Sequence, residues 1–230
     1  MPDRVSRVFE KSVVRRPWGC NAMLEKIRAS IGEALHNQRA GLEQTVIKRL
    51  NTTPRLVLVE VSSSAFAGEN TVPTKCTADG VGVSPPLEWS NLPPGTSSAA
   101  VIVEDADSRT PHPLVHAIVV NLDPRESSLV EGALDSPDHA GVGLATGPNS
   151  FLSHTWLPPD PPPGHGPHQY VFQVFALRGP LFKKAPGREE LVRAITECGI
   201  GAGCVIATYE RARREKNEDS EPLGPDIAPA

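Results

Sequence analysis

The chain has 230 residues, of which 39% are hydrophobic and 22% charged, and it contains 24 prolines and 19 glycines. This length and apolar content predict one domain with extensions, and the many prolines and glycines favour turns over long helices. The sequence has no run of about 18 apolar residues and no apolar segment near its start, so neither a transmembrane helix nor a secretory signal is expected.

Charge is distributed unevenly along the chain. The first 50 residues carry ten Lys or Arg against five Asp or Glu, whereas the remaining 180 carry 13 against 22. An acidic body of this kind is not expected to bind nucleic acid through electrostatic attraction. The four cysteines are too few for a disulfide scaffold, so reduced thiols and a cytoplasmic location are expected, while the spacing of Cys198 and Cys204 leaves a pair open.

Residues 21–50 carry apolar side chains at roughly helical spacing, with charged residues between them. The stripe consists of Leu24, Ile27, Ile31, Leu35, Leu42, Val46 and Ile47. Because its polar face carries both signs of charge, we expect it to pack on the domain or to form a homodimer rather than bind a membrane. The sequence therefore predicts a basic arm and helical extension over 1–52, a β-rich domain over 53–214 and a disordered tail over 215–230.

Four runs rich in β-branched residues and bounded by Gly, Pro, Asn or Asp predict strands. They are Arg55–Val61, Ser97–Val103, Val115–Leu122 and His168–Leu177. Apolar residues occupy both alternating sets of the last run, which indicates a strand buried on both faces. Two short helices are expected after it, over 187–199 and 204–214.

The loop before the last predicted strand is unusually stiff. It has six prolines between Pro158 and Pro167, and each proline fixes φ and removes a backbone donor. This loop delivers His165 and His168 to the start of a core strand. Rigid loops that present polar side chains at strand ends are typical of binding sites, although a solvated surface turn has the same pattern.

Further polar residues lie at the ends of the other predicted strands. Asp105 and Asp107 follow the second strand on one face, and His116 lies early in the third. Carboxylates near an imidazole favour its charged form, so we expect the pKa of the neighbouring histidine to be raised despite burial. A charged histidine beside the backbone N–H groups of a glycine-containing loop suits a small anion. On spacing alone, ordinary turn and core positions are equally compatible.

Five stretches occur in an order that resembles a known family. They are Ser-Pro-Pro-Leu-Glu-Trp at 84–89, Glu-Asp-Ala-Asp-Ser at 104–108 followed by His116, Asn149-Ser150-Phe151 with Trp156, the run from Pro161-Pro162 to Gly166-Pro167-His168-Gln169-Tyr170, and Ala207-Thr208-Tyr209-Glu210-Arg211. Together, over about residues 55–213, they resemble the signature motifs of the phosphatidylethanolamine-binding, or Raf kinase inhibitor-like, proteins.

The resemblance implies a mostly β fold in which a large antiparallel sheet packs on a smaller sheet, with C-terminal helices and, here, an N-terminal helical extension. It also implies one pocket for a phosphate or a phospholipid head group. Carried onto this sequence, the ligand-binding residues are Asp105, Asp107, His116, Pro162, Gly166, His168, Tyr170 and Tyr209. Gln169 replaces the arginine of the family motif, which predicts weaker or differently selective anion binding; Ala106 and Ala117 replace its proline and tryptophan.

The expected function is that of a binding protein rather than an enzyme, without a cofactor and with a kinase or a protease as a possible protein partner. One alternative is a hydrolase that uses Ser108 or Ser153, although no Gly-x-Ser-x-Gly or Cys–His arrangement supports it. The other is a metal site. Its candidate ligands are Asp105, Asp107, His112, His116 and His168, but their spacing is not compact.

Overall fold

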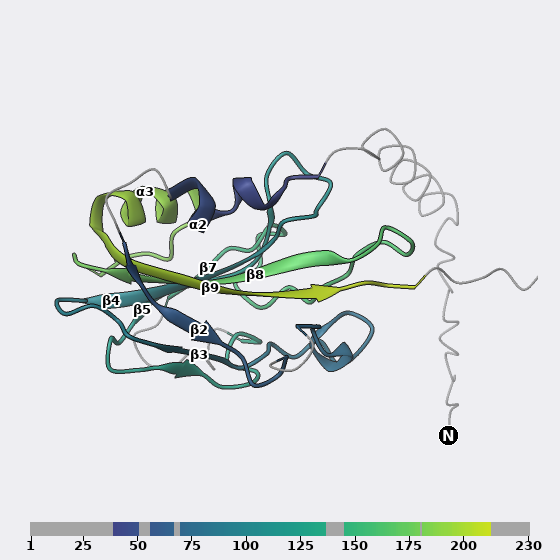
Figure 1. Ribbon diagram of the computed structural model, residues 1–230, viewed down its shortest axis with the longest axis horizontal. Helices are drawn as coiled ribbons and strands as arrows, with labels where there is room; N and C mark the ends of the chain where they lie inside the picture. Colours follow the sequence, from purple (N-terminus) through teal and green to yellow (C-terminus); the bar gives the residue numbers. More distant parts are fainter. Residues whose placement is uncertain (1–38, 51–55, 67–69, 137–144, 180, 213–230) are drawn as a thin grey trace, which may run out of the picture. The chain divides into compact units, whose positions relative to one another are not determined.

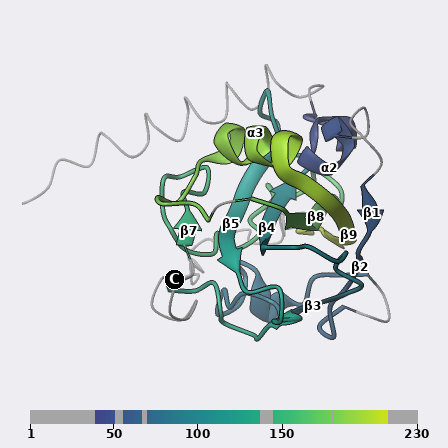
Figure 2. The same ribbon diagram turned by 90° about the vertical axis from the view of Figure 1, so that its left-hand side faces the viewer.

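The computed structural model describes residues 39–50, 56–66, 70–136, 145–179 and 181–212, and these form three layers (Figure 1). A six-stranded sheet lies in the middle. The helices α2 (Val46–Arg49) and α3 (Arg188–Cys198) cover one of its faces, and a three-stranded sheet covers the other, as Figure 2 shows from the side. Two short 3-10 helices, η1 (Leu42–Gln44) and η3 (Thr74–Cys76), complete the regular elements of the described residues.

The large sheet has the strand order β1-β9-β8-β4-β5-β7, and the small sheet has the order β2-β3-β6. The strands are β1 (Val57–Leu58), β2 (Glu60–Ser62), β3 (Leu87–Ser90), β4 (Ser98–Asp105), β5 (Leu114–Leu122), β6 (Ser128–Leu129), β7 (Ala145–Gly147), β8 (His168–Leu177) and β9 (Gly199–Tyr209). All neighbours are antiparallel except β1 and β9. The predicted class, a mostly β fold of a large sheet on a small one, is confirmed, although the large sheet is mixed.

The run predicted as one strand, Arg55–Val61, contributes to both sheets. β1 lies beside β9 in the large sheet, whereas β2 lies beside β3 in the small sheet. The residue between them, Val59, is buried, and its N–H donates to the carbonyl oxygen of Ala202. The chain thus passes from one sheet to the other at Val59.

The second C-terminal helix predicted over 204–214 is wrong, because this part of the chain belongs to β9. β9 pairs with β8 along its whole length, from Gly199 opposite Leu177 to Tyr209 opposite His168. The central strand β8 is buried and needs hydrogen-bonding neighbours on both edges, which β4 and β9 supply. At Gly203 a Cβ atom would lie 1.8 Å from the carbonyl oxygen of Val59, so the crossing chain requires glycine there. The other predicted helix is confirmed as α3.

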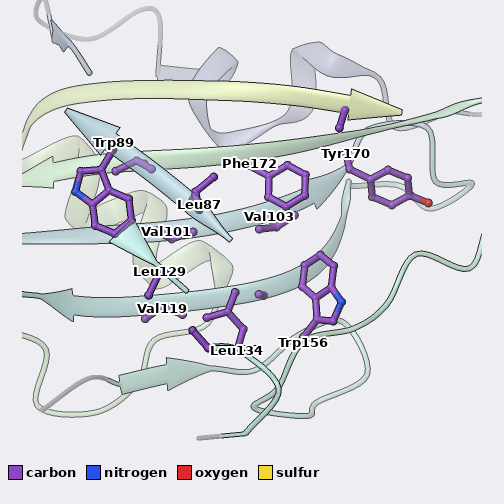
Figure 3. Close-up of a cluster of buried hydrophobic side chains, with 14 of the residues drawn as sticks. Leu87, Trp89, Val101, Val103, Val119, Leu129, Leu134, Trp156, Tyr170 and Phe172 are labelled. Carbon is purple, nitrogen blue, oxygen red and sulfur yellow. The ribbon is translucent and has the colours of Figure 1, made fainter. Parts of the chain in front are cut away.

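Two hydrophobic cores lie on opposite faces of the large sheet. Alternate residues of β4 divide between them, with Val101 and Val103 facing the small sheet and Ala100 and Ile102 facing the helices. Figure 3 shows the first core, where side chains of both sheets meet. The second is closed by α2 and α3. Apolar faces on both sides of β4, β5 and β8 explain their nearly continuous hydrophobic sequences.

The N-terminal segment, as far as it is described, packs on the domain. Val46 and Leu50 are buried in the second core, and the N–H groups of Val46 and Ile47 donate to Glu104 Oε2 and Gln173 Oε1, each at 2.8 Å. The remainder of the predicted helical stripe, residues 21–38, and the predicted tail, residues 215–230, lie outside the described residues. The predicted domain boundaries at residues 52 and 214 stay predictions. Cys198 and Cys204 are free thiols.

Candidate functional site

Antiparallel pairing brings most of the predicted site residues to one edge of the large sheet. Asp105, the last residue of β4, lies opposite Tyr170 in β8. His168, the first residue of β8, lies opposite Tyr209 at the end of β9. β4 extends two residues beyond its predicted end, so Asp105 is part of the strand and its direction is fixed by the sheet.

His116 reaches the same place through a β-bulge. Val103 pairs with Ala117 and Glu104 pairs with Val115, so His116 is the extra residue between these two pairs. Strict alternation would direct its side chain, like that of Ile118, toward the helices. The bulge directs it instead toward the small sheet, where its ring contacts Trp156 and Tyr170.

Asp105 and His168 form a buried hydrogen-bonded pair. Nδ1 of His168 lies 2.9 Å from Oδ2 of Asp105, and both side chains are less than a tenth exposed. Because a carboxylate only accepts, Nδ1 is the donor, which leaves Nε2 as the nitrogen that can meet a ligand. The other carboxylate oxygen of Asp105 accepts from the N–H of Asp107 at 2.8 Å.

His116 and Tyr170 bring two buried polar atoms into the site. Nδ1 of His116 lies 2.6 Å from the carbonyl oxygen of Leu157 and therefore donates to it. His116 Nε2 and the Tyr170 hydroxyl are buried, and neither has a hydrogen-bond partner among the described residues. The two rings meet edge to face, with their centroids 5.1 Å apart. Buried polar atoms without partners are rare in proteins, so a polar molecule, either a water or a ligand, is expected against these two atoms.

Burial controls the titration of both groups. It lowers the pKa of His116, and although the nearby Asp105 carboxylate acts in the opposite direction, burial dominates. The sequence prediction of a raised histidine pKa is therefore wrong for His116. Burial also raises the pKa of the Tyr170 hydroxyl far above its ordinary value, again with Asp105 contributing. Near neutral pH, His116 is an uncharged imidazole with a lone pair on Nε2, and Tyr170 keeps its proton.

Trp156 bounds the site from the loop between β7 and β8. Its ring centroid lies 5.9 Å from that of His116, and its indole N–H donates to the carbonyl oxygen of Cys76 at 3.3 Å. Figure 3 shows Trp156 and Tyr170 together at the end of the core opposite Trp89. The site is therefore continuous with the hydrophobic core, which explains the burial of its polar atoms.

Asp107 lies at the rim, and its carboxylate has partners different from those of Asp105. Oδ2 accepts from the backbone N–H of Gln169 at 2.9 Å and from its side-chain amide at 3.3 Å. Oδ1 lies 2.8 Å from Nη1 of Arg39, whose Nη2 donates to the carbonyl oxygen of His165 at 3.3 Å. Asp107 thus joins the start of β8 to the N-terminal segment.

The proline-rich loop supplies a rim rather than the interior of the site. Pro162 is exposed, and its carbonyl oxygen accepts from the N–H of His165 at 3.3 Å. Gly166 has φ +78°, a left-handed conformation that favours glycine. The ring of His165 stacks beside that of His168 with a centroid separation of 6.1 Å.

Tyr209 belongs to a neighbouring polar cluster. Its hydroxyl donates to Asp79 Oδ2 at 2.7 Å, and the same oxygen accepts from Nε of Arg211 at 2.7 Å. Arg211 also pairs with Asp160, and its carbonyl oxygen accepts from the N–H of Gly164. This cluster anchors the proline-rich loop. The Tyr209 hydroxyl is therefore already hydrogen-bonded to Asp79, and its cluster adjoins Tyr170.

Sequence reasoning missed two groups near the site. Arg39 stands outside every recognised motif, so no sequence signal indicated it. Glu104 could have been noticed as a charge inside an apolar strand, because a buried charge requires a partner. Its side chain is completely buried on the helix side of β4, where Oε1 lies 2.7 Å from Nε of Arg188 and Oε2 lies 2.8 Å from Nε2 of Gln173.

Fold and site together define a two-sheet binding protein with a cluster of buried polar side chains at the strand ends. The sequence model of the phosphatidylethanolamine-binding protein family matches residues 62–210. A UPF0098 protein of Pyrococcus horikoshii is 34% identical over 154 residues, which cover 65% of this chain and 75% of the relative. One from Chlamydia muridarum is 32% identical over 158 residues, covering 66% and 99%. The chain belongs to the phosphatidylethanolamine-binding protein family.

Solved structures agree with this assignment. A phosphatidylethanolamine-binding protein homologue from Chlamydia trachomatis is 32% identical, with a TM-score of 0.59, and the match covers 67% of this chain and 98% of the homologue. YbcL of Escherichia coli is 26% identical, with a TM-score of 0.61 and coverage of 66% and 98%. Within the described part of the chain, no helix is long and apolar enough to cross a membrane.

Proposed function

We propose that the chain binds a small anion, either phosphate or a phosphorylated head group, in the pocket formed by His116, His168, Tyr170 and Trp156. The observation that carries the proposal is the pair of buried atoms, His116 Nε2 and the Tyr170 hydroxyl, without partners among the described residues. An unpaired buried polar group costs about 1–3 kcal/mol. A ligand that bonds to both atoms would recover this free energy.

The geometry also specifies the ligand's hydrogen-bonding character. Because Nδ1 of His116 donates to Leu157, Nε2 of the neutral ring accepts, so the ligand must present a donor to it. The Tyr170 hydroxyl can donate to a ligand oxygen. A phosphate group that carries one proton offers both functions, as a P–O–H donor and as ionised acceptor oxygens. His168, held by Asp105, supports binding from the neighbouring strand end.

Binding fits the contacts of the described residues better than the two alternatives do. The hydroxyl of Ser108 contacts the carbonyl oxygen of Asp105 and accepts from the N–H of Leu114, and that of Ser153 contacts Thr155. Among the histidines that the structure describes, none is hydrogen-bonded to either serine as a base would be. Among the described residues, no group of three or more His, Cys, Asp or Glu is arranged to hold a metal ion. A kinase or protease partner, a homodimer and a cytoplasmic location stay predictions.

The test is a titration of phosphate into the wild type and into His168→Ala. Binding is monitored through the imidazole resonances in NMR spectra. We expect saturable shifts of His116 and His168 in the wild type and much weaker binding by the variant. Tyr170→Phe, which removes only the hydroxyl, should also weaken binding. Identical titration curves for all three proteins would overturn the proposal.

A further inference from the structure

Arg39 comes from outside the segment matched by the family, residues 62–210, yet its side chain lies at the rim of the site. Its guanidinium contacts Asp107 Oδ1 at 2.8 Å and the carbonyl oxygen of His165 at 3.3 Å. Its position is fixed from the backbone as well. The N–H groups of Ala40 and Gly41 donate to the carbonyl oxygens of Ser108 and Ala106, at 3.1 and 2.7 Å.

The charges at the rim show what this arginine contributes. Asp105 and Asp107 are two buried carboxylates, and an anion that approaches them is repelled unless their charge is balanced. Asp105 is paired with His168, and Asp107 is paired with Arg39. Gln169, which occupies the position of the arginine in the resembled motif, is uncharged and bonded to Asp107. Arg39 therefore brings a permanent positive charge to this rim.

The guanidinium also retains donors for a ligand. It has five N–H groups, and its contacts with described residues involve one atom of Asp107 and one of His165. Its side chain is 53% exposed, whereas that of Asp107 is 7% exposed. Each terminal nitrogen makes one contact with the protein, and because the guanidinium has five N–H groups, others remain on this half-exposed side chain to donate to a phosphoryl group.

We propose that Arg39 is a ligand-binding residue of this site, which contacts an ionised phosphoryl oxygen and makes the pocket selective for phosphorylated over uncharged ligands. The inference rests on the proposed anion-binding function and adds a residue supplied from outside the family-matched segment. A purely structural role, in which Arg39 only ties residues 39–41 to the rim, is the competing interpretation. The two interpretations differ in salt dependence, because a guanidinium charge that acts on the bound anion contributes affinity that salt screens, whereas a purely structural tie of residues 39–41 does not.

The experiment titrates inorganic phosphate into the full-length wild type, Arg39→Gln, Arg39→Lys and Arg125→Gln, at two salt concentrations. Arg125 is the matched control, because it forms a local exposed ion pair with Asp123 beyond the far end of β5. We expect Arg39→Gln to weaken binding about tenfold and to reduce its salt dependence, since charge-assisted hydrogen bonds exceed about 1.4 kcal/mol. Arg39→Lys should lose less, and Arg125→Gln should match the wild type.

Thermal melts and ligand-free imidazole shifts of His116 and His168 accompany each titration. Wild-type affinity and salt dependence in Arg39→Gln, with binding still impaired by His168→Ala, would overturn the role of Arg39 and leave anion binding intact. Weakened binding with an unchanged salt dependence and altered ligand-free shifts would show that Arg39 only positions the loop, and would also overturn it. No binding by the wild type would overturn both proposals.

Discussion

Nδ1 of His168 lies 2.9 Å from Oδ2 of Asp105, and the pair joins the end of β4 to the start of β8 inside the protein. The two residues are 63 positions apart in the sequence, and the antiparallel register brings them together. The carboxylate fixes which imidazole nitrogen carries the proton. The orientation of His168 toward a ligand thus depends on a residue that need not touch the ligand.

Replacement of Asp105 by Asn should uncouple this pair. An amide can still accept from the N–H of Asp107, but it no longer holds the His168 ring as a carboxylate does. We expect a loss of about 1.5–3 kcal/mol in the free energy of unfolding, the usual range for a hydrogen bond to a charged group. Urea denaturation measures the loss, and nitrogen chemical shifts of His168 report its tautomer. An unchanged tautomer and unchanged stability would contradict the prediction.

His116 should make stability depend on pH. Burial lowers its pKa in the folded protein, so on acidification the unfolded chain, with a histidine pKa of about 6.5, binds a proton first. Stability is complete above this value and is lost as pH falls through it toward the folded pKa. Asp105 and His168 are the charged or titratable neighbours that act on the ring.

The pH dependence of the wild-type unfolding free energy is compared with that of His116→Gln, whose amide can still donate to the carbonyl oxygen of Leu157. The difference in unfolding free energy between wild type and variant should shrink as pH falls from about 8 to about 5, because the titrating group is absent from the variant. Chemical denaturation at several pH values measures it. A difference independent of pH would show that His116 titrates as it does in the unfolded chain.

The methyl phosphate monoanion and methyl sulfate are two species of equal charge whose affinities can test the lone pair on His116 Nε2. At about pH 6, roughly half of methyl phosphate is a monoanion with one P–O–H group, whereas methyl sulfate is a monoanion without a proton. We expect methyl sulfate to bind at least about tenfold more weakly, since it leaves the buried acceptor unpaired. Calorimetric titration gives both affinities. Tyr170→Phe is the control, because loss of its hydroxyl should weaken both ligands equally; equal wild-type affinities would contradict the prediction.

Removal of one charge from the buried ion pair of Glu104 and Arg188 should strongly lower the free energy of unfolding. Glu104 is fully buried and the Arg188 side chain is 11% exposed, so Glu104→Gln leaves a cation largely out of water. We expect a loss of roughly 3–5 kcal/mol in the free energy of unfolding. The double variant Glu104→Gln with Arg188→Met should recover part of it. Urea denaturation of both single variants and of the double variant measures these losses. If the loss in the double variant equals the sum of the two single losses, the charges are not coupled.

Much of this architecture could be predicted from the sequence, because runs rich in β-branched residues and bounded by turn residues predict strands. β8 has the predicted bounds, and the ordered motifs indicated that Asp105, His116 and His168 would meet. Asp105 and His168 meet because β4 and β8 are antiparallel neighbours, so the last residue of β4 lies beside the first residues of β8. The predicted residues Pro162 and Tyr209 lie at the rim or outside it, and their binding roles stay predictions.

The remainder depended on contacts that no local pattern encodes. The face occupied by His116 depends on a bulge, and strict alternation gives the opposite face. The last strand was mistaken for a helix because Val205, Ile206 and Tyr209 fit a short helical stripe, whereas the close crossing of Val59 over Gly203 requires an extended chain. The burial of Glu104 depends on Arg188, 84 positions away.

The chain supplies a strand to each sheet within residues 57–62, and Val59 between them is bonded to Ala202. The small sheet therefore cannot detach as a separate unit while β1 stays bonded to β9. Backbone amides of β2 and β3 should exchange their hydrogens with solvent through the same opening that exposes the end of β9. The site at the strand ends is continuous with the core that both sheets enclose, so we expect it to open together with this unit rather than by separate detachment of the small sheet.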